Sequence, residues 1–124
     1  MHVQIPPAAE AKLVRCSAGA IFDVVVDLRA SSAQLTKWFG VELTAENRRM
    51  LYVPEGCAHG FQTLVDDSEV VYQISEYYRP DSARGVRWDD PIFAVSWPHE
   101  AHRTMSESDA AYPDFSPRRD VIHL

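Results

Sequence analysis

Cysteine is scarce in this sequence. Its 124 residues include two cysteines, Cys16 and Cys57, which show neither a CxxC spacing nor the paired framework of a disulfide-rich secreted domain. No positively charged, apolar leader precedes them. We therefore expect reduced thiols and a cytoplasmic location.

Long apolar runs and excess positive charge are also lacking. No apolar run approaches the roughly 20 residues that a membrane-spanning helix needs, so we expect no membrane association. The formal net charge is −6, whereas nucleic-acid binding is dominated by basic residues that neutralise phosphates. This charge argues against nucleic acid as a partner, although clustered arginines could still hold a small anion. The 46% hydrophobic content is enough for the buried core of one domain.

Alternating apolar residues predict an all-β fold. Glycine, proline and aspartate divide the chain into short segments, as is typical of a β-sandwich or barrel. Residues 1–10 are expected to be extended, and residues 79–87 to form a loop. β-Branched and aromatic residues mark strands at residues 12–16, 20–28, 38–43, 50–53, 59–65, 70–76 and 92–97.

Two turns organise the central stretch 48–78. Pro54-Glu55-Gly56 ends one strand, because proline fixes φ and glycine supplies backbone freedom. Asp66-Asp67-Ser68 indicates a second turn. The strands on either side of this second turn, 59–65 and 70–76, are therefore expected to pair as a hairpin.

Polar residues interrupt the apolar faces of three predicted strands. His59 alternates with apolar residues, and Tyr72 lies between two aliphatic residues on one strand face, so we expect Tyr72 to point inward. Asp23 and Asp27 share one face of strand 20–28. That face suits the lining of a barrel with a wet interior, and a solvent-facing side explains it equally well.

The spacing of Pro54, Gly56 and His59 resembles the second half of the cupin pattern, in which a strand, a turn and a strand present a histidine into the mouth of a small β-barrel. The first half, an H-x-H pair followed by a glutamate, is absent from this sequence. The converging nitrogen and oxygen ligands of a transition-metal site therefore cannot be assembled from a recognisable motif. We expect a metal-free barrel.

Longer motifs extend the resemblance over residues 1 to about 115. They are KLVRC (12–16), IFDVVVDLR (21–29), KWFGVEL (37–43), AENRRMLYVPEG (45–56), AHGF (58–61), EVVYQISEYY (69–78), GVRWDDP (85–91) and SESD (106–109). Together they resemble dTDP-4-dehydrorhamnose 3,5-epimerase, the cupin-fold enzyme family of dTDP-L-rhamnose synthesis. The resemblance implies an all-β, cupin-type double-stranded β-helix, or jelly-roll barrel. We expect a single domain at 1–115 and a C-terminal tail at 116–124.

The resemblance also implies a reaction. Members of the family are isomerases that epimerise C3 and C5 of dTDP-4-dehydro-6-deoxy-D-glucose without a cofactor, and a homodimer is expected. Epimerising a carbon beside a ketone requires a base that removes the α-proton from one face and an acid that returns a proton to the other. A cation must also stabilise the enolate that forms between the two steps.

The family motifs assign these catalytic roles to residues of this chain. His2 takes the place of the general base, and Asp109 that of the carboxylate that orients and charges it. Tyr72 matches the acid on the opposite face of the sugar. Lys12 matches the lysine near the 4-keto oxygen, where it would both bind the substrate and stabilise the enolate.

Two further residues match substrate contacts. His59 matches a second histidine that touches the substrate, and Tyr78 matches the aromatic residue that stacks on the thymine. Each assignment has an ordinary alternative. Without the resemblance, His2 would be a frayed terminal residue, Tyr72 a core residue whose hydroxyl reaches a backbone partner, and Asp109 a solvated turn residue.

The N-terminus departs from the family pattern. Relatives carry an additional N-terminal segment with strands that build the barrel edge and the dimer, and arginines that hold the diphosphate, so we expect a barrel that is incomplete at its N-terminus. Either Met1 is an internal start of a longer epimerase, or the chain is a truncated, inactive homologue. A third interpretation is a cupin that binds a nucleotide sugar without turnover. Val3, Cys57 and Ser108 stand where the family usually has tyrosine, phenylalanine and a basic residue.

Overall fold

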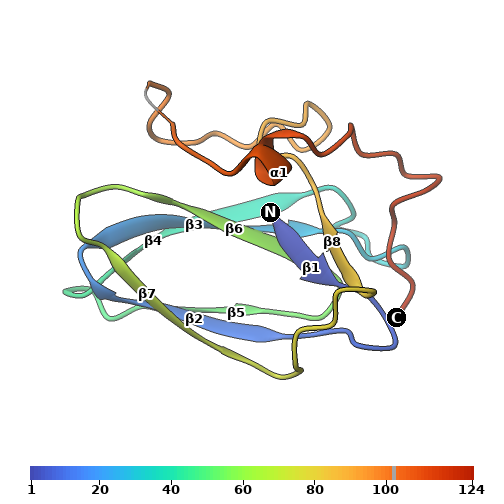
Figure 1. The fold of residues 1–124 in the computed structure, drawn as a ribbon, viewed down its shortest axis with the longest axis horizontal. Coiled ribbons are helices and arrows are strands. Elements are labelled where there is room, and N and C mark those ends of the chain that lie inside the picture. The colour runs from blue at the N-terminus through green and yellow to red at the C-terminus, as the bar shows by residue number, and fades with distance from the viewer. Residues whose placement is uncertain (102) are drawn as a thin grey trace.

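The computed structural model describes residues 1–101 and 103–124, and its strands form two antiparallel sheets (Figure 1). The five-stranded sheet has the order β4-β3-β6-β1-β8, and the three-stranded sheet the order β5-β2-β7. The predicted all-β fold is confirmed. In chain order the elements are β1 (His2–Gln4), β2 (Lys12–Ala18), β3 (Ala20–Asp27), β4 (Trp38–Thr44), β5 (Met50–Val53), β6 (Cys57–Thr63), β7 (Glu69–Ile74), β8 (Ala83–Gly85) and α1 (Glu107–Ala110).

Strand β3 is the centre of the larger sheet. It pairs with β4 on one side and with β6 on the other. Its β-branched residues favour an extended backbone, and Ile21, Val24 and Val26 have no exposed surface. Burying an aliphatic side chain of this size contributes about 1.5–3 kcal/mol. The burial of β3 therefore makes a large contribution to the stability of the larger sheet.

The two faces of β3 belong to different core clusters. Ile21 lies in the cluster between the sheets, together with Val14 of β2 and Val53 of β5. Val24 and Val26 lie in the cluster on the outer face, where the chain after β8 covers the larger sheet (Figure 1). The odd-numbered face of β3, which includes Asp23, is therefore the interior one. Of the two interpretations given above, a solvent-facing side is wrong for Asp23, which lies on the interior face and has no exposed surface.

The last residues of the chain pack on this outer face. Phe115 and Ile122 are buried in the outer cluster, and Ile122 forms a parallel β-bridge with Arg29. The expected division into a domain at 1–115 and a tail at 116–124 stays a prediction. In the structure, Ile122 of the predicted tail is buried in the same core cluster as residues of the predicted domain.

The predicted hairpin between strands 59–65 and 70–76 is wrong. Strand β6 lies in the larger sheet and β7 in the smaller one, so the turn around Asp67, whose φ is 56°, carries the chain from one sheet to the other. Turn residues predict that a chain changes direction but not which strand it then joins. In the described part of the chain, β3 and β4 are the only consecutive strands that pair with each other.

The predicted strand at residues 92–97 is also wrong. The segment begins in a turn at 92–93 and continues without regular structure at 94–97. The Asp90 carboxylate accepts a hydrogen bond from the Ile92 amide at 3.0 Å, and Ala94 has a φ of 50°, so the backbone is not extended there. The segment 79–87, expected to be a loop, contains β8, which pairs with β1. The described residues include no helix long and apolar enough to cross a membrane.

Candidate active site

A cavity of about 990 Å³ brings together all six residues singled out in the sequence. They reach it from both sheets and from the chain that follows them: His2 from β1, Lys12 from β2, His59 from β6, Tyr72 from β7, Tyr78 from the segment after β7, and Asp109 from α1. These residues are up to 107 positions apart in the chain. The topology, rather than local sequence, therefore assembles the site.

His2 and Asp109 form a hydrogen-bonded pair on one wall of the cavity. The distance from His2 Nε2 to Asp109 Oδ1 is 2.6 Å, and the side chains are 57% and 32% exposed. Burial alone would raise the pKa of the Asp109 carboxyl. The hydrogen bonds of His2 and Ser106, with the positive charges of His2 and the N-terminal ammonium, outweigh it and hold that pKa below its ordinary value. Asp109 is therefore a carboxylate at neutral pH.

Helix α1 is a single turn that presents Asp109. Ser106 is its N-cap, and the Ser106 hydroxyl accepts a hydrogen bond from the Asp109 amide at 3.2 Å. A serine followed three residues later by an acidic residue is a helix-start signal, and SESD at 106–109 has this pattern. Sequence reasoning used the motif for its resemblance and missed the helix that it starts.

Lys12 has a partner that sequence reasoning missed. Its Nζ lies 3.1 Å from Glu10 Oε1, and both side chains are 9% exposed. Both residues line the cavity. Residues two positions apart on an extended chain point to the same side, so the spacing of Glu10 and Lys12 was an available signal. The carboxylate fixes the ammonium inside the cavity.

A second histidine pair joins the cavity lining, through His59, to the buried interior. His59 Nε2 is 2.5 Å from Asp23 Oδ1, and these side chains are 7% and 0% exposed. Strand pairing brings them together, because Val25 faces His59 across β3 and β6 and Asp23 lies two residues away on the same face. Sequence reasoning placed Asp23 on a polar face without giving it a partner. Asp23 Oδ2 is buried and has no hydrogen-bond partner among the described residues.

The smaller sheet supplies the opposite wall. Tyr72 faces the cavity with Ile74 and Glu76 and is nevertheless 49% exposed, since the cavity is open to solvent there. Tyr78 is 73% exposed. In the strand register Val14 faces Tyr72 across β2 and β7, so Lys12 and Tyr72 lie on neighbouring strands.

Two arginines add positive charge to the wall of the cavity. Arg84 lies on β8, and Arg103 lies over the Trp88 ring with 4.4 Å between the guanidinium carbon and the ring centroid. The same lining also carries the carboxylates of Glu10, Glu76 and Asp109, so the two arginines are the planar, bidentate groups on the cavity wall that suit a phosphate. Sequence reasoning did not single out either arginine, because their place beside the cavity depends on how the chain after β7 folds back.

The arrangement can support proton transfer at a carbon beside a carbonyl. A histidine backed by a carboxylate lies on the wall made by β1 and α1, and a lysine and a tyrosine lie on β2 and β7. Within residues 1–101 and 103–124, no group of three or more histidine, cysteine, aspartate or glutamate side chains is arranged to hold a metal ion. The expectation of a metal-free, cofactor-independent site stays a prediction.

Comparisons with known proteins identify similar chains. Residues 1–117 match the family model for dTDP-4-dehydrorhamnose 3,5-epimerase. The chain is 43% identical over 113 residues to the dTDP-4-dehydrorhamnose 3,5-epimerase of Sinorhizobium fredii, an alignment that covers 91% of this chain and 58% of the relative. The chain thus spans little more than half of that protein's length.

Solved structures show the same architecture. The crystal structure of dTDP-4-dehydrorhamnose 3,5-epimerase from Elizabethkingia anophelis matches with a TM-score of 0.92 at 37% identity and covers 96% of this chain and 65% of that one. The dTDP-6-deoxy-D-glucose-3,5-epimerase of Legionella pneumophila, in complex with dTDP-4-keto-L-rhamnose, matches with a TM-score of 0.85 at 38% identity, covering 90% of this chain and 58% of that one.

Proposed function

The chain belongs to the dTDP-4-dehydrorhamnose 3,5-epimerase family, and on this premise we propose that it epimerises C3 and C5 of dTDP-4-dehydro-6-deoxy-D-glucose. The reaction serves dTDP-L-rhamnose synthesis and needs no cofactor. One observation supports this proposal most directly. The pair of His2 and Asp109 and the hydroxyl-bearing Tyr72 line one cavity from different sheets, as a base and an acid acting on opposite faces of a sugar require.

In the proposed mechanism His2 is the general base. Asp109 accepts the hydrogen bond of Nε2, which leaves the other ring nitrogen to take the α-proton, and its negative charge stabilises the imidazolium that forms. Lys12, aimed by Glu10, stabilises the enolate oxygen that develops from the 4-keto group. Tyr72 then returns a proton to the carbon from the opposite face.

The proposed substrate contacts follow the shape and charge of the cavity. His59, fixed by Asp23, would touch the sugar, and the exposed Tyr78 ring would stack on the thymine. Arg84 and Arg103 are the cations available to the diphosphate. The Legionella pneumophila relative, crystallised with dTDP-4-keto-L-rhamnose, supports this class of ligand.

A nucleotide-sugar-binding cupin without turnover is the second candidate. The exposure of the His2 side chain, 57%, favours it, because a general base must be held close to its productive position. This candidate retains the contacts of His59 and Tyr78 and loses only the chemistry.

We also propose a homodimer and a cytoplasmic location. The outer face of the three-stranded sheet supports the dimer, since Met50, Tyr52 and Val71 are 50%, 62% and 37% exposed there. Light scattering of the purified chain would measure its oligomeric state directly. For the location, the two cysteines, which are free in this structure, are compatible with a reducing compartment.

Solvent deuterium exchange tests the function. The chain is incubated in D₂O with dTDP-4-dehydro-6-deoxy-D-glucose beside a His2→Ala variant, and NMR measures deuterium at C3 and C5. Incorporation that the variant abolishes supports the epimerase. A folded chain that binds the nucleotide sugar by calorimetry without incorporation favours the binding protein, and a folded chain that does neither overturns both candidates.

A further inference from the structure

The hydrogen bond between His2 and Asp109 has little support of its own. Helix α1 is four residues long and has no buried residue, so its own packing cannot fix the Asp109 carboxylate. The His2 side chain is mostly exposed, and one hydrogen bond still allows an exposed ring to turn. The geometry of the pair must therefore depend on neighbouring residues.

Tyr112 is the side chain packed against His2. The two ring centroids are 6.3 Å apart with an interplanar angle of 67°, an edge-to-face arrangement. Tyr112 lies three residues after Asp109 in the chain, so one short segment supplies both the hydrogen-bond partner of His2 and the ring that limits its rotation. Neither sequence reasoning nor the proposed mechanism gives Tyr112 a role.

Gly85 makes room for the Tyr112 ring. Gly85 faces His2 directly in the pairing of β1 with β8. A Cβ atom built on Gly85 would overlap the Tyr112 ring at Cζ, Oη and Cε2. The ring thus occupies the space that any other side chain would fill at this position, and the strand pairing places that space beside His2.

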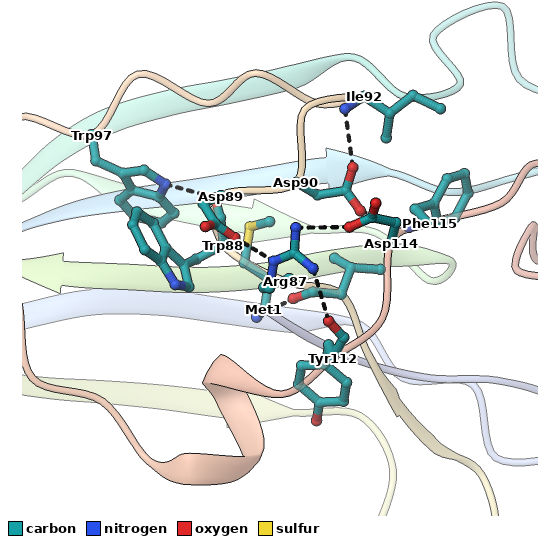
Figure 2. Close-up of polar contacts among 11 residues, drawn as sticks. Met1, Arg87, Trp88, Asp89, Asp90, Ile92, Trp97, Tyr112, Asp114 and Phe115 are labelled. Atoms are coloured by element: carbon teal, nitrogen blue, oxygen red, sulfur yellow. Dashed lines mark hydrogen bonds and ion pairs between the residues drawn. The ribbon is translucent and has the colours of Figure 1, made fainter.

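Arg87 fixes the backbone of the segment that contains Tyr112 (Figure 2). Its Nη1 donates to the Tyr112 carbonyl at 3.2 Å, and its Nη2 lies 2.7 Å from Asp114 Oδ1. Its Nε donates to Asp89, which orients the guanidinium from the other side. Arg87 follows Gly85 by two residues, so the space for the ring and the anchor for its backbone come from one short piece of chain.

A buried carboxylate holds the far end of the same segment. Asp90, 1% exposed, accepts a hydrogen bond from the Phe115 amide at 2.6 Å, and the Phe115 ring packs on Phe93 with 5.1 Å between centroids. On the other strand, the Met1 ammonium donates to the Val86 carbonyl at 2.9 Å, and the Val86 amide donates to the Met1 carbonyl at 2.9 Å. The segment after α1 and strand β1 are thus fastened to the same stretch of chain.

We propose that Tyr112, seated over Gly85 and anchored by Arg87, is a positioning residue that holds the His2 ring in its hydrogen bond with Asp109. Tyr112 does not touch the substrate and exchanges no proton. It acts through His2 by limiting the orientation and the tautomer of the imidazole. The inference deepens the proposed function and rests on it, because a fixed tautomer matters only if His2 is the base.

The test compares Tyr112→Ala with Tyr112→Phe, which keeps the ring and removes the hydroxyl. The steady-state rate of deuterium incorporation is one readout. In Tyr112→Ala we expect kcat to fall about 10-fold or more with little change in KM, because a misaligned base slows proton transfer without removing substrate contacts. Tyr112→Phe should restore kcat. Tyr77→Ala, at an 85% exposed tyrosine outside the cavity lining, is the matched control.

The second readout needs no activity. Nitrogen-15 NMR of the neutral His2 ring reports which ring nitrogen is protonated, and in the wild type we expect one tautomer, protonated at Nε2 where Asp109 accepts its hydrogen bond. Tyr112→Ala should show a mixture of both tautomers, and Tyr112→Phe the wild-type spectrum. Gly85→Ala, which displaces the ring without removing it, should also give the mixture and serves if Tyr112→Ala fails to fold.

The outcomes are distinguishable. A single tautomer and an unchanged kcat in Tyr112→Ala overturn the positioning role. So does a loss of kcat in both Tyr112 variants with an unchanged tautomer, because that result would point to the hydroxyl. If the wild type incorporates no deuterium, the proposed function fails, and the nitrogen-15 spectra still decide whether Tyr112 orders the His2 ring.

Discussion

Two histidine and aspartate pairs, each with its histidine in the lining of the cavity, share a chemistry and differ in their surroundings. His2 and Asp109 are joined at 2.6 Å and are 57% and 32% exposed, whereas His59 and Asp23 are joined at 2.5 Å and are 7% and 0% exposed. Adjacent strands of one sheet hold the buried pair. In the exposed pair only His2 lies on a strand, β1, whereas Asp109 lies on a single-turn helix followed by an anchored loop.

The difference separates two uses of the same interaction. A buried pair is held rigidly by the strand register and cannot lose one partner without leaving the other desolvated. An exposed pair contributes little to stability but can exchange protons with a ligand in the cavity. We therefore expect substitutions in the exposed pair to reduce activity and substitutions in the buried pair to reduce stability.

The largest expected effect is on the exposed pair's activity. Asp109→Asn keeps the size of the side chain and removes its charge, so the imidazolium of His2 loses its stabilisation. The rate of deuterium incorporation should fall by about 10²–10⁴-fold, the usual contribution of general acid and base catalysis. NMR in D₂O measures the rate, with urea unfolding as the control for folding. A folded variant with the wild-type rate would contradict the assignment of Asp109.

The next effect is on the buried pair's stability. Asp23→Ala leaves His59 buried without its partner, so the free energy of unfolding should fall by about 3 kcal/mol. Asp109→Ala is the matched change in the exposed pair and should cost less than about 1 kcal/mol. Urea unfolding followed by tryptophan fluorescence measures both. Equal losses for the two variants would remove the distinction between the pairs.

A smaller effect is expected at the helix that presents Asp109. Ser106→Ala removes the N-cap of α1, a change that usually costs about 1 kcal/mol of local helix stability. Because this cost falls on α1 alone, the rate should fall by less than about 10-fold while urea unfolding of the whole chain stays unchanged. Ser106→Thr, which retains a capping hydroxyl, should keep the wild-type rate. A loss of global stability in Ser106→Ala would show that α1 is coupled to the core.

The smallest effect is a pH dependence of stability. The pKa of Asp109 is lowered in the folded chain, so the unfolded chain binds more protons at acidic pH. The stability that Asp109 contributes is therefore present above its unfolded pKa, about 3.9, and is lost as pH falls through the lower, folded value. The difference in unfolding free energy between wild type and Asp109→Asn should shrink as the pH falls below about 4. Urea unfolding at stepped pH measures it, and a difference that grows on acidification would contradict the lowered pKa.

The positions of most strands could be predicted from the alternation of apolar and other residues along the sequence. Strands β2 to β7 begin and end within two residues of their predicted bounds, because β-branched residues that alternate with others fit a half-buried sheet. The pairing of these strands could not be predicted locally. The turn at Asp66-Asp67-Ser68 has the chemistry of a hairpin, and only the whole topology shows that it joins two sheets.

The part of the site that could be predicted is the set of residues that the family motifs contain. The motifs named residues that the structure brings into one cavity, while their catalytic roles stay predictions. The partners of these residues were harder to find. Asp23, Glu10 and Tyr112 belong to no recognisable chemical motif, and their importance arises from strand register, extended spacing and the space left by Gly85.

The crossing of the chain between sheets has a kinetic consequence. Since consecutive strands pair only at β3 and β4 within the described residues, most contacts join distant parts of the chain, and the relative contact order is high. Folds of this kind form in about milliseconds to seconds, because loop-closure entropy is lost before distant contacts compensate for it. His2 and Asp109 are 107 positions apart, so they can meet only after β1, β8 and the segment beyond them have docked. Recovery of exchange activity during refolding should therefore lag behind strand formation and mark completion of the native topology.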